Sequence, residues 1–139
     1  MSSDESVYVP DLGWILTLFV LVVAVEHVWF LVLEMFLWTH PIGLKTFRNT
    51  AERARESATL AANQGLYNGF LAAGLLWGVL HPDPDVALQV KVFFLTCVVV
   101  AGVFGAATVS KRILYIQAVP AATALGVAWL RQPTLPPAR

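Results

Sequence analysis

The chain has 139 residues, of which 58% are hydrophobic and 13% are charged, and its formal net charge is zero. Soluble domains contain about 25% charged residues, so this composition excludes an ordinary soluble domain and indicates an integral membrane protein embedded in the lipid bilayer. A membrane topology without excess positive charge also excludes nucleic acid as a partner.

The first predicted membrane span covers residues 13–38 and has the sequence GWILTLFVLVVAVEHVWFLVLEMFLW. It exceeds the roughly 20 residues that a helix needs to cross the hydrocarbon, and it is too long for the apolar part of a signal peptide. Three ionisable residues, Glu26, His27 and Glu34, interrupt it. A charge at this depth costs at least about 2.5 kcal/mol, so such residues are rare and often mark a functional site.

His27 and Glu34 lie seven positions apart in this span. That spacing is almost two helical turns, so both side chains project from one face of the helix, about 10 Å apart along its axis, while Glu26 points about 100° away. An imidazole and a desolvated carboxylic acid can both exchange protons near neutral pH, which makes His27 and Glu34 the candidate catalytic residues. The alternative is structural: Glu34 bonds to a neighbouring helix, and His27 is a neutral core histidine.

The connection over residues 39–59 is the longest between predicted spans, and it begins with a helix break at His40-Pro41-Ile42-Gly43. Beyond the break, residues 44–57 place apolar side chains at helical spacing with basic side chains around the other face. This pattern predicts a short interfacial helix. Its basic residues are Lys45, Arg48, Arg53 and Arg55.

The second predicted span, residues 60–80, is polar in its first half, where it holds three carboxamides and a phenol. Hydrocarbon cannot satisfy these donors and acceptors, so they must bond to other helices, to water or to a ligand. Asn68 lies about 10 Å from the cytoplasmic boundary, between the depths of Glu34 and His27, and Gln117 of the last span reaches a similar depth. The candidate ligand-binding residues are therefore Asn63, Gln64, Tyr67, Asn68 and Gln117. Contacts between helices are the alternative explanation for the amides.

Two GxxxG pairs follow one another in the same span, Gly65 with Gly69 and Gly74 with Gly78. Small residues at this spacing let membrane helices approach closely, which makes this span central to the packing. The same glycine-rich faces are candidate surfaces for a homo-oligomer.

Two further predicted spans, residues 89–109 and 113–130, complete a single domain over residues 1–139, an all-α polytopic bundle of four transmembrane helices. Lys111 and Arg112 join the last two spans and share one side with the basic first connection, so the positive-inside rule makes that side cytoplasmic. The acidic N-terminal segment and the C-terminus are then outside an inner membrane. The polar residues lie in the cytoplasmic half, which predicts a pocket that opens toward the cytoplasm.

Metal and cofactor motifs are absent from the sequence. Zinc and iron sites need three or four convergent ligands, whereas His40 and His81 belong to loops on opposite sides, so we expect neither a metal nor a cofactor. The single cysteine, Cys97, lies within a span and allows no intramolecular disulfide.

Two stretches resemble the domain-of-unknown-function 1304 family of small bacterial membrane proteins: HVWFLVLEMFLWTHPIGLKTF, residues 27–47, and LAANQGLYNGFLAAGLLWG, residues 60–78. The resemblance implies a four-helix membrane fold with a histidine and a glutamate in the first helix, here His27 and Glu34, and the NQGLYNG segment in the second. It implies no activity. A smaller similarity, at residues 62–64, is to the membrane-associated proteins of eicosanoid and glutathione metabolism, but Tyr67 and Asn68 stand where that group has an acidic residue.

The sequence thus predicts a membrane protein whose polar pocket binds a small or lipophilic ligand, and it leaves open whether that ligand is also transformed. Two other functions fit the same residues. One is a proton-linked transporter of a small solute, in which Glu34 and His27 bind and release the proton. The other is an accessory membrane subunit without chemistry.

Overall fold

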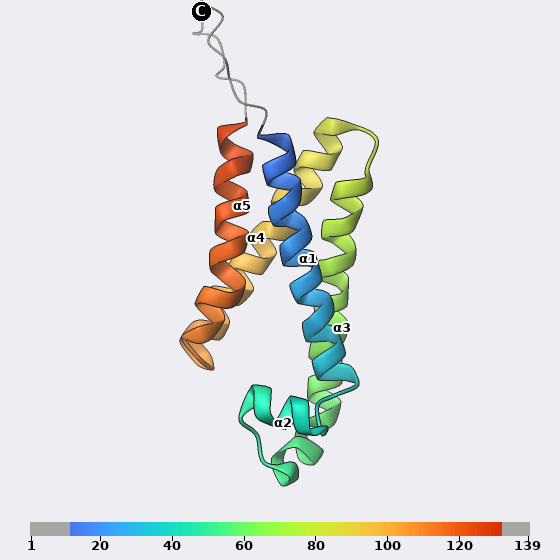
Figure 1. The fold of residues 1–139 in the computed structure, drawn as a ribbon, viewed down its shortest axis with the longest axis vertical. Coiled ribbons are helices and arrows are strands. Elements are labelled where there is room, and N and C mark those ends of the chain that lie inside the picture. Colours follow the sequence, from blue (N-terminus) through green and yellow to red (C-terminus); the bar gives the residue numbers. More distant parts are fainter. Residues whose placement is uncertain (1–11, 132–139) are drawn as a thin grey trace, which may run out of the picture.

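The structure is a computed structural model that describes residues 12–131, and all of the regular structure in that range is helical (Figure 1). The all-α class expected from the sequence is therefore confirmed. Asp4, Glu5, Asp11 and Arg139, which bear on the orientation of the termini, lie outside the described residues. The elements are, in chain order, α1 (Gly13–Met35), α2 (Pro41–Phe47), α3 (Ala51–Leu80), α4 (Pro84–Thr108), the short π-helix η1 (Leu114–Ala118) and α5 (Val119–Leu130).

The connection between α1 and α3 differs from the sequence-based expectation. α2 ends at Phe47, because Arg48 adopts a left-handed conformation with φ of 52°. α3 begins at Ala51, after Thr50 caps it by accepting a hydrogen bond from the backbone N–H of Arg53 at 3.3 Å. The single interfacial helix expected over residues 44–57 is thus replaced by α2 and the first turns of α3, since the cap starts a new helix inside that range.

α4 begins at Pro84, five residues before the start expected at residue 89. A carboxylate oxygen of Asp83 accepts hydrogen bonds from the backbone N–H groups of Asp85 and Val86, at 2.9 and 3.1 Å, and so caps the helix. Pro84 stands in the first turn, where its missing N–H costs nothing. This early start places Lys91 two turns inside α4 instead of at its end.

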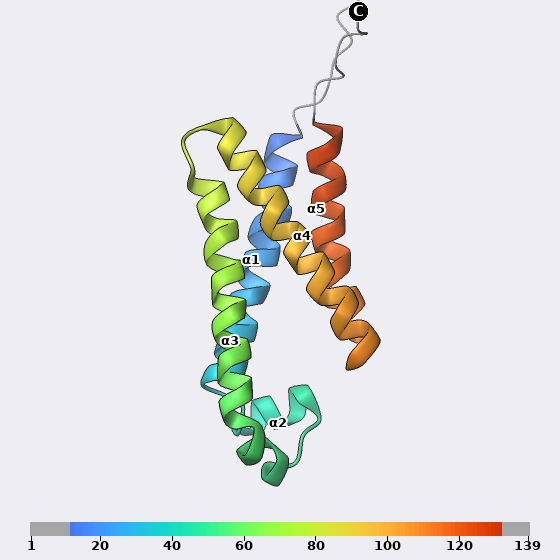
Figure 2. The ribbon, with the colours of Figure 1, turned by 180° about the vertical axis from the view of Figure 1, so that it is seen from behind.

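The long helices form a ring, in which α1 and α4 each pack against both α3 and α5. α4 crosses obliquely behind α1 in Figure 1, and Figure 2 shows its course from the α3–α4 loop toward the first turns of η1 and α5. We call the end of the bundle that holds the start of α1, the α3–α4 loop and the end of α5 the terminal end. The opposite end, which holds α2, is the α2 end.

The apolar core lies in the half of the bundle toward the terminal end. α1 and α4 contribute branched side chains, whereas α5 contributes three alanines, whose small size allows its close approach. The fully or almost fully buried members of this core are Leu16, Val20, Val23, Ala24, Leu75, Leu95, Val98, Ala121, Ala124 and Ala128.

The glycines of α3 face two different helices of the same chain. A Cβ atom at Gly65 would lie 3.1 Å from both the Leu31 carbonyl oxygen and Glu34 Cβ on α1. One at Gly74 would collide with the Phe94 ring of α4, and one at Gly78 would lie 3.1 Å from the Lys91 backbone nitrogen. These glycines therefore admit α1 and α4 within the chain, and the homo-oligomer expected from the same faces stays a prediction.

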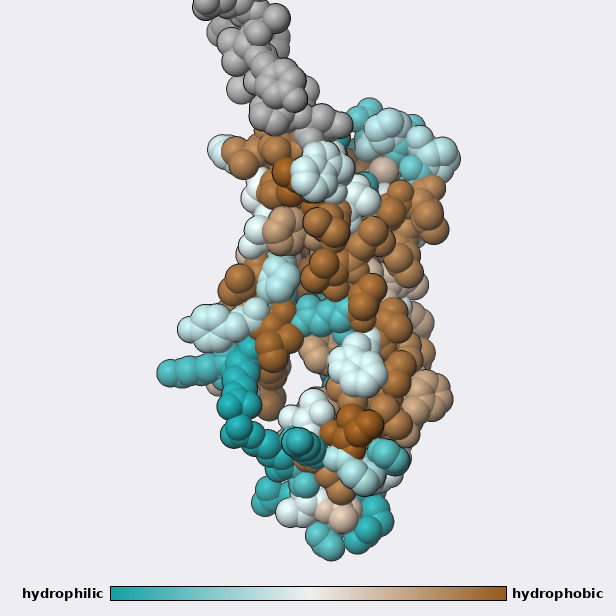
Figure 3. Space-filling model, viewed as in Figure 1, coloured by the Kyte–Doolittle hydropathy of each residue, from teal (hydrophilic) through white to brown (hydrophobic). Residues whose placement is uncertain are grey.

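The face of the bundle seen in Figure 3 is largely apolar between its two ends. Large side chains such as Phe104 on α4, Leu80 on α3 and Trp129 on α5 are about 70–80% exposed. Two helices, α1 and α4, are long and apolar enough to cross a membrane, as judged by length and composition. The apolar stretch Leu114–Leu130 is shorter.

We expect Gly65→Leu to lower the free energy of unfolding by about 1–3 kcal/mol, because the new side chain must push α3 away from the α1 backbone. Thermal unfolding in detergent measures the change. The matched control is Gly126→Leu on α5, since Gly126 has no neighbouring atom within 4 Å of its Cβ direction. Equal destabilisation by both substitutions would contradict the close packing of α1 on α3.

Candidate functional site

Glu34 and Asn68 join α1 to α3 by a short hydrogen bond. The Asn68 Nδ2 group donates to Glu34 Oε2 at 2.7 Å. Gly65, one turn before Asn68, has no side chain, so the α1 backbone lies close to α3 there and Glu34 is within reach of Asn68. Asn68 is 7% exposed and Glu34 is partly buried. The structure therefore brings together the two residues whose depths the sequence matched.

His27 is fully buried and is bonded through both ring nitrogens. Its Nδ1 lies 2.8 Å from the carbonyl oxygen of Val23, one turn earlier, and its Nε2 lies 3.2 Å from Nε2 of Gln117 on η1. A carbonyl oxygen can only accept, so Nδ1 must carry the proton. Nε2 of the neutral ring is then the acceptor for the Gln117 amide. This geometry assigns the tautomer of His27.

Gln117 owes its position to a local widening of the last helical segment. Residues Leu114–Ala118 form a π-helix, and the segment changes to α5 at Val119. Pro120 supplies no N–H to the turn before it, which favours such an irregularity. π-helical turns occur frequently at functional sites. Here the widened turn carries the amide that meets His27.

The two polar pairs share one face of α1 but bind different helices. His27 joins α1 to η1, and Glu34, about 10 Å farther along the axis, joins α1 to α3. Each pair consists of a group that can change protonation and an amide that can rotate by 180° to present either N–H or C=O. In each pair the amide can therefore stay hydrogen-bonded to His27 or Glu34 when that group gains a proton.

Three of the predicted ligand-binding residues do not join these pairs. Asn63, Gln64 and Tyr67 are exposed, Tyr67 to 61%, and the Tyr67 ring has an edge contact with Phe70 at 6.1 Å between ring centres. They lie on the surface of α3, whereas Asn68 and Gln117 reach the α1 face. A direct role at the Glu34–His27 site is thus supported by position for Asn68 and Gln117 only.

Glu26 is the third ionisable residue of α1. It is partly buried, and its Oε1 atom is buried with no hydrogen-bond partner among the described residues. Its direction, about 100° from that of His27, separates it from both polar pairs. We assign it no role in the site.

The space next to the polar pairs is open on one side. Figure 3 shows a gap through the molecule between the α4–η1 turn, the second half of α1 and α2. α1 and α3 continue together toward α2, whereas α4 leans away from them (Figure 1). Within residues 12–131, no group of three or more His, Cys, Asp or Glu side chains could hold a metal ion.

Sequence reasoning did not single out Lys91, which is 9% exposed. The signal was present in Asp83-Pro84, a cap residue followed by proline, because this pair predicts a helix start and hence a lysine two turns inside the helix.

The geometry described so far defines an all-helical protein with two helices suited to a membrane and two partly buried polar pairs on one helix face. Its sequence matches the family described as "Protein of unknown function (DUF1304)" over residues 21–129, so the chain belongs to that family, as its two signature stretches indicated. It is also similar to the "Uncharacterized protein YpaA" of Lactococcus lactis subsp. lactis (strain IL1403), with 29% identity over 99 residues that cover 70% of this chain and 82% of that protein. No solved structure matches the chain.

We expect Asn68→Leu to lower the free energy of unfolding by about 0.6 to 2 kcal/mol, because it removes the interhelical bond to Glu34. Chemical or thermal unfolding in detergent measures the change. The matched control is Asn63→Leu, the same substitution at an exposed position of the same helix, and it should have little effect. In a double-mutant cycle, Glu34→Met, which removes both acceptor oxygens, should reduce the cost of Asn68→Leu. Purely additive effects would contradict the pairing.

Proposed function

We propose that the protein is a single-domain, multi-pass inner-membrane protein with four spans, in α1, α3, α4 and the η1–α5 segment. Support comes from the apolar length of α1 and α4 and from the large exposed apolar side chains on α3 and α5. In water, such a continuous apolar surface would cause association, whereas lipid covers it at no cost. The bilayer is then the principal partner of the outer surface.

The charge distribution supports one orientation in the membrane. The α2 end holds a basic set, Lys45, Arg48, Arg53 and Arg55, and the α4–η1 turn adds Lys111 and Arg112. The positive-inside rule makes that side cytoplasmic. The terminal end, and with it both termini, is then outside.

Cysteine labelling tests this topology. In a Cys97→Ala background, we expect Asp85→Cys to react with a membrane-impermeant maleimide added from outside, because Asp85 lies in the first turn of α4 at the terminal end. We expect Lys111→Cys to react only after the membrane is permeabilised. Labelling of both from one side would contradict the number of spans, and the reversed pattern would contradict the orientation.

The polar pairs on α1 line a ligand pocket that opens toward the cytoplasm. Two observations together support this proposal. A carboxylic acid, Glu34, and an imidazole, His27, are each hydrogen-bonded to a side-chain amide, of Asn68 and Gln117 respectively. The second half of α1, which carries both Glu34 and His27, borders the gap toward η1. Interhelical bonding alone would need neither ionisable groups nor open space.

The chemistry of the lining indicates the kind of ligand. A ligand that enters between α1 and η1 meets an apolar helix surface with hydrogen-bonding groups at two depths, so it should carry a small polar head group and an apolar body. Glu34 and His27 can exchange a proton with that head group, while Asn68 and Gln117 orient them. Chemical transformation of the ligand, or movement of a proton with it, would use the same four side chains.

Native mass spectrometry of protein released gently from membranes tests the pocket. We expect a co-purifying small molecule on the wild-type protein, which is lost in Glu34→Gln and in His27→Ala while the helical circular dichroism is unchanged. The matched control is Glu52→Gln, an exposed carboxylate in the first turn of α3, which should retain the molecule.

Other outcomes would overturn the proposal. If the molecule stays bound in both pocket variants, it occupies another part of the protein. If no molecule co-purifies and Glu34→Gln lowers the melting temperature as much as Gly65→Leu does, the pairs only join helices, and an accessory subunit without chemistry is the better description.

A further inference from the structure

A second charged site lies at the terminal end, far from the polar pairs. A cavity of about 310 Å³ opens there between α1, the α3–α4 loop, α4 and the end of α5. Its volume corresponds to about ten water molecules, which is ample for a phosphate group. Among residues 12–131, its lining includes two cationic side chains, Lys91 and Arg131, together with Thr17 and His81, and no acidic side chain.

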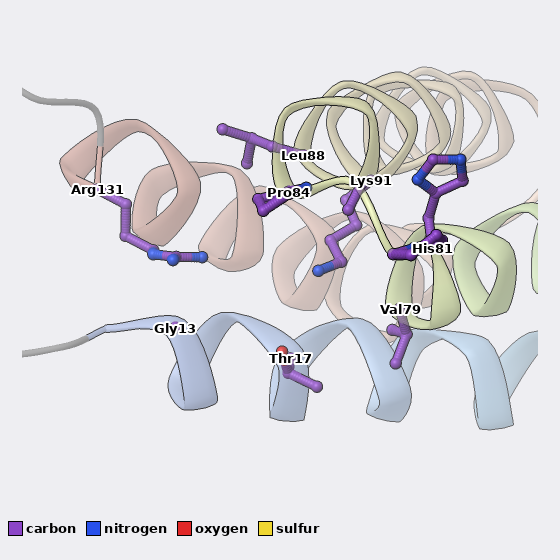
Figure 4. Close-up of a pocket in the computed structure, with 10 residues that line it drawn as sticks. Gly13, Thr17, Val79, His81, Pro84, Leu88, Lys91 and Arg131 are labelled. Carbon is purple, nitrogen blue, oxygen red and sulfur yellow. The ribbon is translucent and has the colours of Figure 1, made fainter.

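Lys91 is the unusual member of this lining. It is 9% exposed, and its stem packs on α3, where a Cβ atom at Gly78 would lie 2.8 Å from Lys91 Cγ. Figure 4 shows the Lys91 side chain extended into the cavity toward α1 and α5. No hydrogen bond or ion pair joins its ammonium group to any residue of the range 12–131. The Lys91 stem is buried while its ammonium group reaches the open cavity, where an anion would give it a partner of opposite charge.

Arg131 supplies a second cation to the same space. It follows the end of α5, and Figure 4 shows its guanidinium group directed toward Lys91 across the cavity. Asp83 of the α3–α4 loop does not line the cavity, and its carboxylate accepts hydrogen bonds from the first turn of α4 instead of pairing with Lys91 or Arg131. Two like charges directed at one cavity repel each other unless an anion lies between them.

The depth of this cavity in the membrane indicates which molecule would supply the anion. Three exposed tryptophans belong to the same end of the bundle: Trp14 at the start of α1, Trp77 near the end of α3 and Trp129 near the end of α5. Exposed tryptophans gather at the depth of the lipid head groups. The cavity therefore lies where lipid phosphates are found, and Lys91 is about 10 Å below the start of α4.

We propose that Lys91 and Arg131 form a binding site for the phosphate of an anionic phospholipid on the outer side of the membrane. Lys91 binds the phosphate oxygens as a point charge inside the cavity, and Arg131 binds them from the rim through its planar guanidinium. The Thr17 hydroxyl is a further donor on the α1 side of the cavity. The site depends on the four-span arrangement proposed above and is independent of the Glu34–His27 pocket.

Lipid retention tests this site in the full chain. The purified protein is exchanged into mixed micelles of detergent with phosphatidylglycerol or with phosphatidylcholine, and bound lipid is counted by native mass spectrometry. We expect preferential retention of phosphatidylglycerol, reduced about tenfold in Lys91→Met and in Arg131→Gln, since each removes one charge-assisted contact. Lys91→Met keeps the apolar stem that packs on Gly78, and Arg131→Gln changes an exposed residue after α5.

The controls separate this site from general attraction of lipid to basic residues. Arg112→Gln removes an exposed cation at the other side of the protein and should leave retention unchanged. Glu34→Gln should also leave lipid retention unchanged. The experiment therefore distinguishes an error in the proposed Glu34–His27 pocket from an error in the proposed lipid site. Displacement of the lipid by millimolar inorganic phosphate would identify a site for the free anion. Equal retention in Lys91→Met, Arg131→Gln and Arg112→Gln would overturn the proposal.

Discussion

The close approach of α3 to α1 at Gly65 is the contact on which the rest of the site depends. Without a side chain at this position, the α1 backbone lies near enough for the Asn68 amide to reach Glu34 at 2.7 Å. Gly69 also faces α1, at Leu31, whereas Gly74 and Gly78 admit α4 in the same way. α3 is therefore the spacer of the bundle. Its small residues allow α1 and α4 to approach closely, and this short distance lets the Asn68 amide hydrogen-bond to α1.

The apolar surroundings of the polar pairs explain why each ionisable group is hydrogen-bonded to an amide. In an apolar bundle a carboxyl group and an imidazole are tolerated only where other groups complete their hydrogen bonds, and here each receives one amide from a different helix. The two amides differ in origin. Asn68 belongs to a regular helix, whereas Gln117 reaches His27 from a π-helical turn, whose extra residue changes the direction of its side chain. Such a turn also marks where α1 and η1 separate.

The sequence was sufficient for the helical class, for the family and for the matching depths of Glu34 and Asn68, because these follow from composition, motif and helical rise. The starts of α3 and α4 were harder to predict. The Thr50 and Asp83 caps begin these helices before the apolar runs from which the spans were predicted. The rotation of α3 about its own axis, which decides which side chains face α1, could not be predicted from the sequence. Asn63, Gln64 and Asn68 are close in sequence, but only tertiary packing decides which of them faces α1, and a single chain contains no periodic signal strong enough to show it.

The cationic pair Lys91 and Arg131 is separated from the polar pairs of α1 by the apolar core. Lys91 lies toward the terminal end, and His27 lies on the far side of a layer formed by side chains such as Val20, Val23 and Leu95, all fully buried. A solute that passed straight through the bundle would have to displace this layer, at a cost that rises with each buried side chain moved. A pocket closed at its inner end needs no such movement. In the pocket proposed above, this packed layer would form the closed inner end, so a ligand would enter and leave by the same opening beside η1.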